Sequence, residues 1–366
     1  MKAVFLFLLM LTGISHSCIA QTETTPTEAV RATLMNYING RNQGDIERLR
    51  SAFHPEADLR YLRNDSSFTI WPVQDYISRI QPGRTANCIA RIISIDIVGV
   101  GAQAKIELEY PNRKYADYIN LLKVDGEWLI AVKTFSVEPI DPTKHILFVL
   151  TSHEEMGNTG RPTGLHLGEV THAYRPLIEA GYEVDFVSPK GGAAFMYGTD
   201  LNDPNNLWFV QNPNAYYRFT NAMSPNQIDA TRYAAIYFVG GHGTMWDLPE
   251  HQELGEITRI IYEQDGVVAG VCHGPSGLVN VRLSNGEYLV ANKRMTSFTD
   301  QEETAARAQD IVPFMLETTL RERGAIFIGA DNWQENVIVD ERLVTGQNPA
   351  SARGVAERMI GLLGQR

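Results

Sequence analysis

The spacing of apolar positions changes along the chain. From residue 25, apolar residues recur every three or four positions, as on one face of a helix: Val30, Leu34, Tyr37 and Ile38. Residues 25–28 (TPTE) form a capping box before them, and Gly40 is expected to end this helix. Two shorter helices are expected at 45–53 and 73–80.

The spacing then becomes the two-residue alternation of strands, at 92–98, 103–110, 115–124 and 127–134. Asp125 and Gly126 separate the last two segments and favour a two-residue hairpin turn with positive φ. Helices followed by an antiparallel meander predict an α+β domain over residues 21–138.

Prolines at 139 and 142 interrupt regular structure, because each removes a backbone donor and restricts the residue before it. We expect a linker at 139–143 and a second domain at 144–366. There, buried strands alternate with helices: strands at 145–150, 183–188, 234–239 and 267–269, helices at 167–180 and 249–264. This alternation predicts a doubly wound, flavodoxin-like α/β domain, whose sites form at the carboxyl ends of its parallel strands.

One of these strand ends carries the most informative motif, Gly270-Val271-Cys272-His273-Gly274. Small residues two positions either side of a nucleophile are typical of a sharp strand-to-helix turn that exposes the central side chain. A cysteine at a helix N-terminus is favoured as a thiolate, and His273 can add positive charge or accept a proton. The alternative is a buried structural cysteine.

A second strand end carries Gly240, Gly241 and His242. Their backbone N–H groups, with that of His273, could form an oxyanion hole, and the alternative is a glycine-rich turn alone. Residues 192–232 are long and aromatic for a bare connection and are expected to cap the cleft.

Glu169 lies near the start of the first helix of this domain. A carboxyl group held against a thiol in a low-dielectric pocket stays protonated and can shuttle a proton, whereas the alternative is a solvated helix residue. His153-Glu154-Glu155 and the pair His166 and His172 lack convincing zinc spacing, so no metal site is expected.

The charge, the N-terminal residues and the cysteines limit the classes of partner and the compartment that we expect. The formal net charge of −11, without a cluster of Lys or Arg, argues against nucleic acid or an anionic membrane surface as partners. A positive Lys2 and an apolar run at 3–11 predict a signal peptide at 1–20, cleaved after Ala20, and hence export to the periplasm. Cys18 leaves a lipoprotein open, and no other stretch is apolar enough for membrane insertion. The remaining Cys88 and Cys272 are expected to be free thiols.

Residues 144–366 resemble the ThiJ/PfpI superfamily of the class I glutamine amidotransferase-like fold, and within it the chaperone-like glyoxalase III group. The matching segments are RPTGLHLGEVTHAYRPLIEAGYEVDFVSPKGG, YFVGGHGTMWDLPE, GVCHGPSGLV, SFTDQEE and DERLVTGQNPASARGVAERMI. The resemblance implies that Glu169, Cys272 and His273 form the catalytic site, and that Glu303 or the neighbouring Glu302 orients the histidine. Amidotransferases use a His-x-Glu pair downstream of the cysteine, and since none follows Cys272 here, glutaminase activity is disfavoured.

Residues 25–138 resemble the SnoaL-like, nuclear transport factor 2-like superfamily, in particular its lumazine-binding group. The segments that carry this are YINGRNQGDIERLRSAFHPEADL and YINLLKVDGEWLIAVKTF. The resemblance implies a cone-shaped domain whose mouth sometimes holds a ligand, and dimerisation through the sheet. His54, Asp58, Tyr61 and Trp71 could line that mouth, or could be turn and core residues of a non-catalytic dimerisation module.

Together, these resemblances imply a homodimer that converts 2-oxoaldehydes such as methylglyoxal to 2-hydroxy acids, without glutathione or any cofactor. Cys272 would be the nucleophile. The alternatives are a stress-related holdase or redox-sensing protein of the same fold, and a cysteine peptidase.

Overall fold

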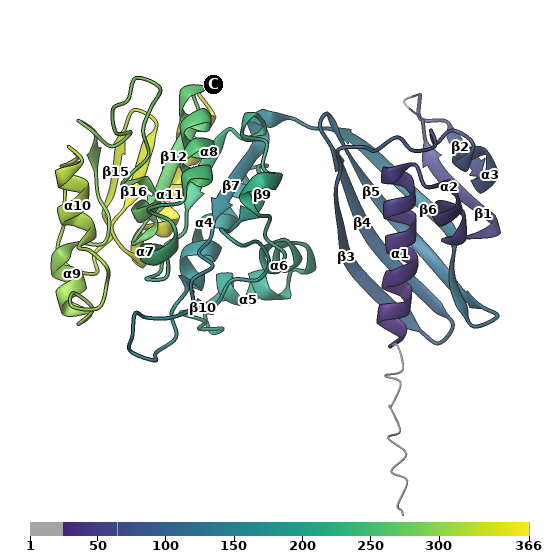
Figure 1. Ribbon diagram of the computed structural model, residues 1–366, viewed down its shortest axis with the longest axis horizontal. Coiled ribbons are helices and arrows are strands. Elements are labelled where there is room, and N and C mark those ends of the chain that lie inside the picture. Colours follow the sequence, from purple (N-terminus) through teal and green to yellow (C-terminus); the bar gives the residue numbers. More distant parts are fainter. Residues whose placement is uncertain (1–24, 64, 366) are drawn as a thin grey trace, which may run out of the picture. The chain divides into compact units, whose positions relative to one another are not determined.

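The computed structural model describes residues 25–63 and 65–365. The predicted signal peptide at 1–20 therefore lies outside the described residues. Contacts divide the chain into two compact units, one of Met1–Ile106 with Ala116–Ser136, the other of Glu107–Tyr115 with Val137–Arg366. Each unit has its own sheet and helices (Figure 1). The expected linker at 139–143 stays a prediction.

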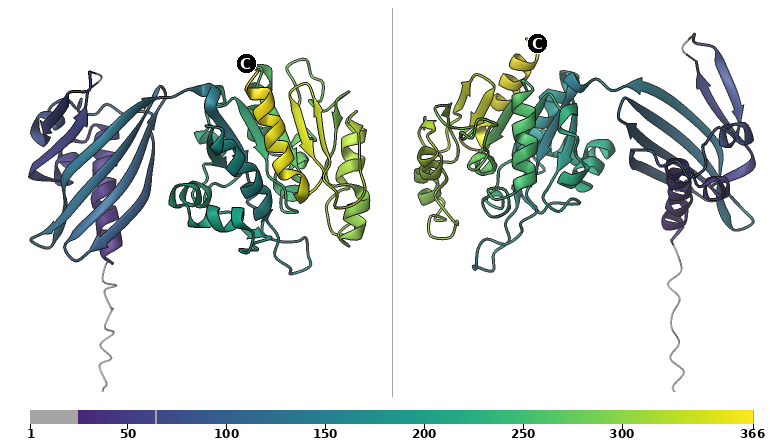
Figure 2. Two further views of the ribbon diagram at one scale, coloured as in Figure 1. Left: turned by 180° about the vertical axis from the view of Figure 1, so that it is seen from behind. Right: turned by 45° about the horizontal axis from the view of Figure 1, so that its top comes forward.

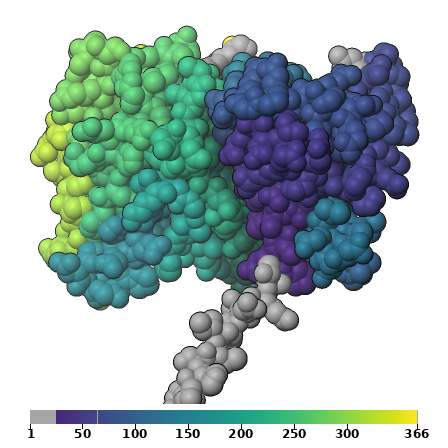
Figure 3. All heavy atoms as spheres, turned by 45° about the vertical axis from the view of Figure 1, so that its right-hand side comes forward, coloured from purple at the N-terminus to yellow at the C-terminus, as the bar shows by residue number. Residues whose placement is uncertain are grey.

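The first unit opens with the long helix α1 (Pro26–Gln43), and its expected capping box is present. The Thr25 N–H donates to Glu28 at 2.8 Å, and the Glu28 N–H donates to Thr25 Oγ1 at 3.2 Å. The helix does not end at Gly40 but continues to Gly44, which has a φ of +65°. Gly40 serves packing instead, because a Cβ there would lie 2.4 Å from the Leu49 backbone nitrogen. The outer side of α1 lies at the surface, in dark purple in Figure 3.

A six-stranded sheet packs against this helix, in the order β2-β1-β6-β5-β4-β3. The four expected strands are present as β3 (Ile89–Val98), β4 (Gly101–Tyr110), β5 (Arg113–Val124) and β6 (Glu127–Pro139). Asp125 and Gly126 have the positive φ values that the hairpin requires. Two strands were not expected, β1 (Phe53–Leu62) and β2 (Phe68–Pro72), because a bulge in β1 breaks the alternation of its apolar residues. The short helices are α2 (Ile46–Ser51) and α3 (Val73–Ile77).

The second unit is built on a sheet of order β15-β16-β12-β11-β7-β9. Its strands are β7 (His145–Val149), β9 (Glu183–Val187), β11 (Ala235–Phe238), β12 (Val267–Val271), β15 (Val337–Asp340) and β16 (Leu343–Gly346). All neighbours are parallel except β15, which pairs antiparallel with β16. Counted in chain order, the parallel strands run 2-1-3-4-5, so the expected flavodoxin-like order is confirmed.

Helices cover both faces of this sheet (Figure 2). The helices α4 (Leu167–Glu179) and α11 (Ala352–Leu363) pack side by side on one face. The helices α8 (Gln252–Glu263) and α10 (Leu316–Glu322) contribute to the apolar cluster on the other face. Because both faces are covered, β7, β11 and β12 consist of buried residues throughout, which explains their continuous apolar sequences.

The segment 192–232 forms β10 (Met196–Tyr197), α5 (Pro204–Gln211) and α6 (Pro213–Thr220). The expectation that this segment caps the cleft is correct for residues 198–206, five of which line the cavity beside the site, but not for the aromatic rings of α5 and α6. Phe209 and Phe219 are fully buried, and both rings contact Phe186 of the sheet. These helices therefore extend the core, while Tyr197 of β10 turns towards the residues around Cys272.

The remaining elements are short. They are β8 (Leu165–His166), α7 (Thr244–Asp247), β13 (Arg294–Met295), α9 (Asp300–Ala305), β14 (Ile326–Phe327) and the 3-10 turns η1 (Pro142–Lys144), η2 (Pro225–Gln227), η3 (Ala230–Arg232), η4 (Gly274–Leu278) and η5 (Pro349–Ser351). Among the helices of the described residues, none is both long and apolar enough to cross a membrane.

Candidate active site

Cys272 lies directly after β12, in the sharp turn that the sequence predicts. Its φ of +58° is left-handed, a conformation that a non-glycine residue adopts at some energetic cost. Gly274 is required, because a Cβ there would lie 2.1 Å from the Phe238 carbonyl oxygen. Gly270 is less constrained, since its Cβ would lie 3.3 Å from Pro275. The tight turn therefore depends mainly on the glycine after the cysteine.

The thiol of Cys272 is buried, with 4% of the residue exposed. The element that follows is η4, a five-residue 3-10 turn, so Cys272 does not lie at the N-terminus of an α-helix. Burial and the neighbouring Glu169 carboxyl raise the pKa of the Cys272 thiol well above its usual value. The expectation of a resting thiolate is therefore wrong, and the free protein holds a neutral thiol.

A base lies next to that thiol. Cys272 Sγ is 3.3 Å from His273 Nδ1, and His273 Nε2 is 2.7 Å from Glu303 Oε2. Burial, with the neighbouring His242, lowers the pKa of His273 to about 4, against the opposing hydrogen bond to Glu303. His273 is therefore neutral at pH 7, and its Nδ1 lone pair is available to accept the thiol proton.

Glu303, and not Glu302, reaches His273. Although burial opposes its ionisation, hydrogen bonds from His242 and His273 lower the pKa of Glu303 to about 2. Glu302 instead completes the capping box of α9 with Thr299 and accepts a hydrogen bond from the Trp333 N–H. The choice that the sequence left open is therefore decided by which side of the short helix α9 faces the histidine.

Glu169 approaches the thiol from the first turn of α4. Glu169 is fully buried, and this burial raises the pKa of its carboxyl group to about 8. Hydrogen bonds with Cys272 and Gly240 act in the opposite direction and lower the pKa, but by less. The Gly240 N–H donates to Glu169 Oε2 at 2.9 Å, and a Cβ on Gly240 would lie 2.3 Å from that oxygen. Within the described part of the chain, Oε1 has no hydrogen-bond partner that meets distance and angle criteria, so this buried oxygen is available to a substrate.

The expected oxyanion hole is only partly available. The Gly240 N–H is engaged by Glu169, and the His242 N–H donates to Tyr197 Oη at 3.2 Å. Gly241 has a φ of +111° and lies against the backbone of another loop at Gly164. A Cβ added at Gly241 would lie 2.4 Å from the Gly164 carbonyl oxygen, so only glycine allows this close approach. These glycines therefore position Glu169 and the loop. The sequence places Tyr197 only among the aromatic residues of the segment expected to cap the cleft, because nothing in residues 192–232 marks it as the partner of His242.

The histidines considered for a metal do not converge. His153 contacts the Glu155 carbonyl oxygen, and His172 is paired with Asp203. Within the described residues, potential ligand atoms of His242, His273 and Glu303 lie within 4.8 Å of one another. Both histidines already bond Glu303 through Nε2, so a metal ion would have to displace both hydrogen bonds.

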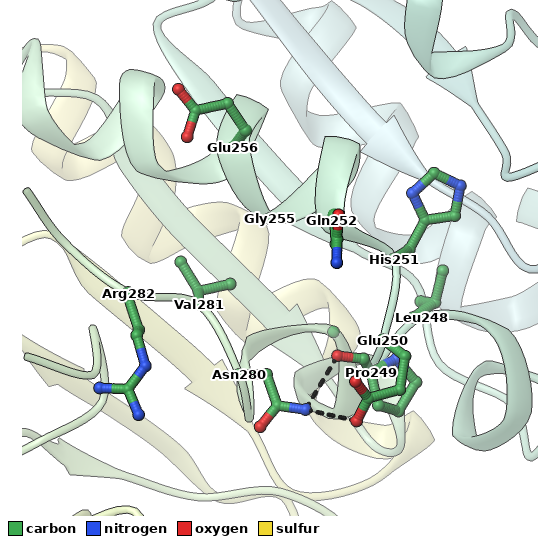
Figure 4. Close-up of a pocket in the computed structure, with 11 residues that line it drawn as sticks. Leu248, Pro249, Glu250, His251, Gln252, Gly255, Glu256, Asn280, Val281 and Arg282 are labelled. Carbon is green, nitrogen blue, oxygen red and sulfur yellow. Dashed lines mark hydrogen bonds between the residues drawn. The ribbon is translucent and has the colours of Figure 1, made fainter. Parts of the chain in front are cut away.

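The linings of two cavities of the second unit bear on where a substrate could bind. One of about 580 Å³ is lined by His166, Gly168 and Gly198, which neighbour Glu169 and Tyr197 in sequence. The other, of about 340 Å³, is shown in Figure 4 and is lined by residues of α8 and by Asn280 and Arg282. Asn280 Nδ2 donates across its floor to the Pro249 carbonyl oxygen at 3.1 Å. Neither lining includes Cys272 or Glu169, but the first cavity contains the direct sequence neighbours of Glu169 and Tyr197, Gly168 and Gly198, whereas the second does not.

The candidate residues of the first unit are only partly brought together. The rings of Tyr61 and Trp71 lie 6.3 Å apart in an aromatic cluster. Asp58 is paired with Arg60, and His54 accepts a hydrogen bond from the Glu56 N–H. They therefore form no shared polar site.

The polar group inside the first unit is one that the sequence did not indicate. The Lys133 ammonium donates to Asp117 and to Tyr37 Oη, both at 2.8 Å. Burial lowers the pKa of Lys133 to about 8, against the attraction of Asp117. A buried ion pair of this kind, which also binds a tyrosine hydroxyl, is consistent with a structural role.

Comparisons with known proteins separate the two units. A family model described as "Putative lumazine-binding" matches residues 25–136, and the DJ-1/PfpI family model matches residues 163–361. The first supports the resemblance that the helix-then-meander pattern suggested, and the second covers more than half of the chain.

Named relatives align with the second unit. The chain is 33% identical over 240 residues to "Glutathione-independent glyoxalase HSP31" of Saccharomyces cerevisiae, covering 60% of this chain and 98% of the relative. It is 28% identical to the crystal structure of glyoxalase III from Candida albicans, with a TM-score of 0.56 over 60% of this chain and 97% of that one. It is 37% identical to a Francisella tularensis rapid encystment protein, with a TM-score of 0.58 over 60% of this chain and 99% of that one. From the match over 163–361 and this similarity, the chain belongs to the DJ-1/PfpI family.

Proposed function

We propose that this protein is a glutathione-independent, glyoxalase III-type enzyme, which converts a 2-oxoaldehyde such as methylglyoxal to the 2-hydroxy acid. The observation that carries this is a thiol with a neutral imidazole on one side and a protonated carboxyl group on the other. The relatives named as glutathione-independent glyoxalases support the same assignment.

The first step adds the thiol to the aldehyde carbon, C1. The Cys272 proton moves to His273 Nδ1 as the carbon–sulfur bond forms, and Glu303 stabilises the resulting imidazolium. The protonated Glu169 donates its proton to the aldehyde oxygen. A hemithioacetal results, and Glu169 is left as a carboxylate.

The second step moves a hydrogen between adjacent carbons. The Glu169 carboxylate removes the proton from C1 and delivers it to C2, which was the ketone carbon. In the same step, the C1 hydroxyl must lose a proton and the C2 oxygen must gain one, so that a thioester of the 2-hydroxy acid forms.

Hydrolysis restores the site. Glu169 takes a proton from water as the oxygen attacks C1, and His273 returns its proton to the leaving Cys272 sulfur. Every proton taken from the protein has then been replaced, and one water has been consumed. No glutathione takes part, because the nucleophilic sulfur is Cys272 of the protein itself.

The direct test uses the full chain with methylglyoxal, without glutathione and with EDTA present. We expect lactate from the wild type and a loss of kcat/KM on the order of 10³-fold or more for Cys272→Ser, because serine is a weaker nucleophile beside the same base. Cys88→Ser is the matched control, since Cys88 is the other cysteine of the described residues. A folded wild type that forms no lactate would overturn the proposal and favour a holdase or redox sensor.

We also propose that the protein is exported to the periplasm and that its signal peptide is cleaved after Ala20. In addition, we propose that it forms a homodimer through the sheet of the first unit. The apolar run at 3–11 supports export. Exposed apolar side chains on β5, Tyr118 and Leu122, support the dimer, because solvent-facing positions of a sheet are usually polar.

A further inference from the structure

The carboxylate of Glu303 is shared by two histidines. His273 Nε2 lies 2.7 Å from Oε2, and His242 Nε2 lies 2.9 Å from Oε1. An ionised carboxylate only accepts hydrogen bonds, so each imidazole must carry its proton on Nε2. In the neutral form of each imidazole, Nδ1 is then the lone-pair acceptor, a tautomer assigned from the hydrogen-bond network.

Each of these acceptors faces a different acidic group. His273 Nδ1 faces the Cys272 thiol at 3.3 Å, and His242 Nδ1 faces Tyr197 Oη at 3.4 Å. The Tyr197 hydroxyl therefore donates to His242 Nδ1 and accepts from the His242 N–H. The second arm, Glu303–His242–Tyr197, repeats the logic of the first, Glu303–His273–Cys272, with a phenol in place of the thiol.

Tyr197 is held in place by the groups around it. The His166 ring lies edge-on to the Tyr197 ring, with 5.4 Å between centroids. The next residue, Gly198, has a φ of +66°, and a Cβ there would lie 2.4 Å from His166 Nε2. Negative charge on Cys272 or Glu169 acts on the Tyr197 hydroxyl, so the phenol lies in the field of the reacting groups.

The proposed reaction leaves one proton transfer without a protein group, from the C1 hydroxyl to the C2 oxygen. Glu169 is occupied with the carbon-bound proton, and His273 holds the thiol proton until hydrolysis. The missing group must donate to one oxygen and accept from the other, which a neutral hydroxyl can do and a carboxylate cannot.

We propose that Tyr197 is the second acid–base group of the site, and that His242 positions it. Tyr197 gives its proton to the C2 oxygen as C1 loses its proton, and it regains a proton from the C1 hydroxyl as the thioester forms. Tyr197 thus ends each turnover as it began. This inference rests on the proposed glyoxalase function and assigns the transfer between the two oxygens within it.

The test compares Tyr197→Phe with Tyr217→Phe, the same substitution in α6 of the same segment. For Tyr197→Phe we expect kcat with methylglyoxal to fall about 10²-fold or more, with little change in KM. The mass of the intact protein should meanwhile show the hemithioacetal on Cys272 accumulating during turnover. Tyr217→Phe should behave as the wild type in both measurements.

His242 is tested as a positioning residue by two substitutions. Gln can donate to Glu303 and accept from Tyr197, whereas Leu can do neither. We therefore expect His242→Gln to retain more kcat than His242→Leu, while both still form the adduct on Cys272. Circular dichroism of each variant verifies that it is folded.

The outcomes separate the two claims. An active wild type with an inactive Cys272→Ser, but with normal kcat for Tyr197→Phe, would overturn the role of Tyr197 and leave the enzyme assignment intact. A fall in kcat without adduct accumulation would also overturn the role of Tyr197. A block after the first step lets the adduct accumulate, whereas general damage to the site slows adduct formation as well. A wild type without turnover would overturn both the function and this inference.

Discussion

At the scale of single residues, the site is organised by which groups keep their protons. Burial raises the pKa of Glu169 to about 8, whereas hydrogen bonds from two histidines lower that of Glu303 to about 2. One carboxyl group is thus an acid at neutral pH and the other a fixed negative charge. The chain separates these roles by placing Glu169 on an apolar helix face and Glu303 between two imidazoles.

The protonated state of Glu169 has a measurable consequence for stability. Its pKa in the folded protein, about 8, is above the ordinary 4.5, so the unfolded chain releases the proton at lower pH. Stability is therefore fully present below about pH 4.5 and falls as pH rises towards 8, by about 1.4 kcal/mol per pH unit. We expect wild type to lose stability relative to Glu169→Gln between pH 6 and about 8, measured by urea unfolding. Parallel stability profiles of the two proteins would show that Glu169 is ionised in the folded state.

At the scale of elements, the sequence predicts most strands and helices correctly because their apolar residues keep one spacing. It fails where other constraints act. The bulge in β1 interrupts the alternation that would predict this strand. Gly40 resembles a helix end in the sequence, but in the structure it allows the close approach of the Leu49 backbone. The motif at residues 270–274 predicts the position of Cys272, but not the length of η4 or the burial that keeps the thiol protonated. Tyr197 could not be predicted, because its role depends on a contact with His242, 45 residues away.

One glycine of the β11–α7 loop determines whether Glu169 fits. A Cβ on Gly240 would lie 2.3 Å from Glu169 Oε2, 2.5 Å from the Val271 carbonyl oxygen and 2.8 Å from Cys272 Cβ. We expect Gly240→Ala to displace the carboxyl group and lower kcat by about 10²-fold or more while the protein stays folded. Gly361→Ala in α11 is the control, since its Cβ would meet nothing within 4 Å and alanine favours a helix. Wild-type kcat for Gly240→Ala would contradict the close approach of Glu169.

At the scale of the whole molecule, two patterns of apolar residues give two units, each with its own sheet. The fold class of both was predictable, because a meander and a strand–helix alternation are long-range patterns that local irregularities do not erase. The boundary between the units is harder to predict from the sequence. The strand β6 extends to Pro139, and the contacts within the chain assign Glu107–Tyr115 to the second unit. Contacts of this kind leave no periodic trace in the sequence.

The proposed dimer is tested on the full chain by a charge on the side of β5 that exposes Tyr118 and Leu122. Leu122 is 48% exposed, and Leu201, in a loop of the second unit, is 50% exposed. We expect Leu122→Asp to reduce the mass measured by light scattering from a dimer to a monomer, because a buried unpaired carboxylate is costly at an interface. Leu201→Asp should remain dimeric. A wild type that is monomeric at high concentration would contradict the dimer.

The most direct test of the central claim is the mass of Glu169→Gln after exposure to methylglyoxal. The account predicts a covalent adduct on Cys272, located by peptide mapping, because Cys272 and His273 are unchanged and solvent water can protonate the aldehyde oxygen in place of Glu169. Lactate formation should fall about 10²-fold or more, because the transfer of the proton from C1 to C2 has lost its carrier. Lactate formation at the wild-type rate, or adducts on other residues with Cys272 unmodified, would contradict it.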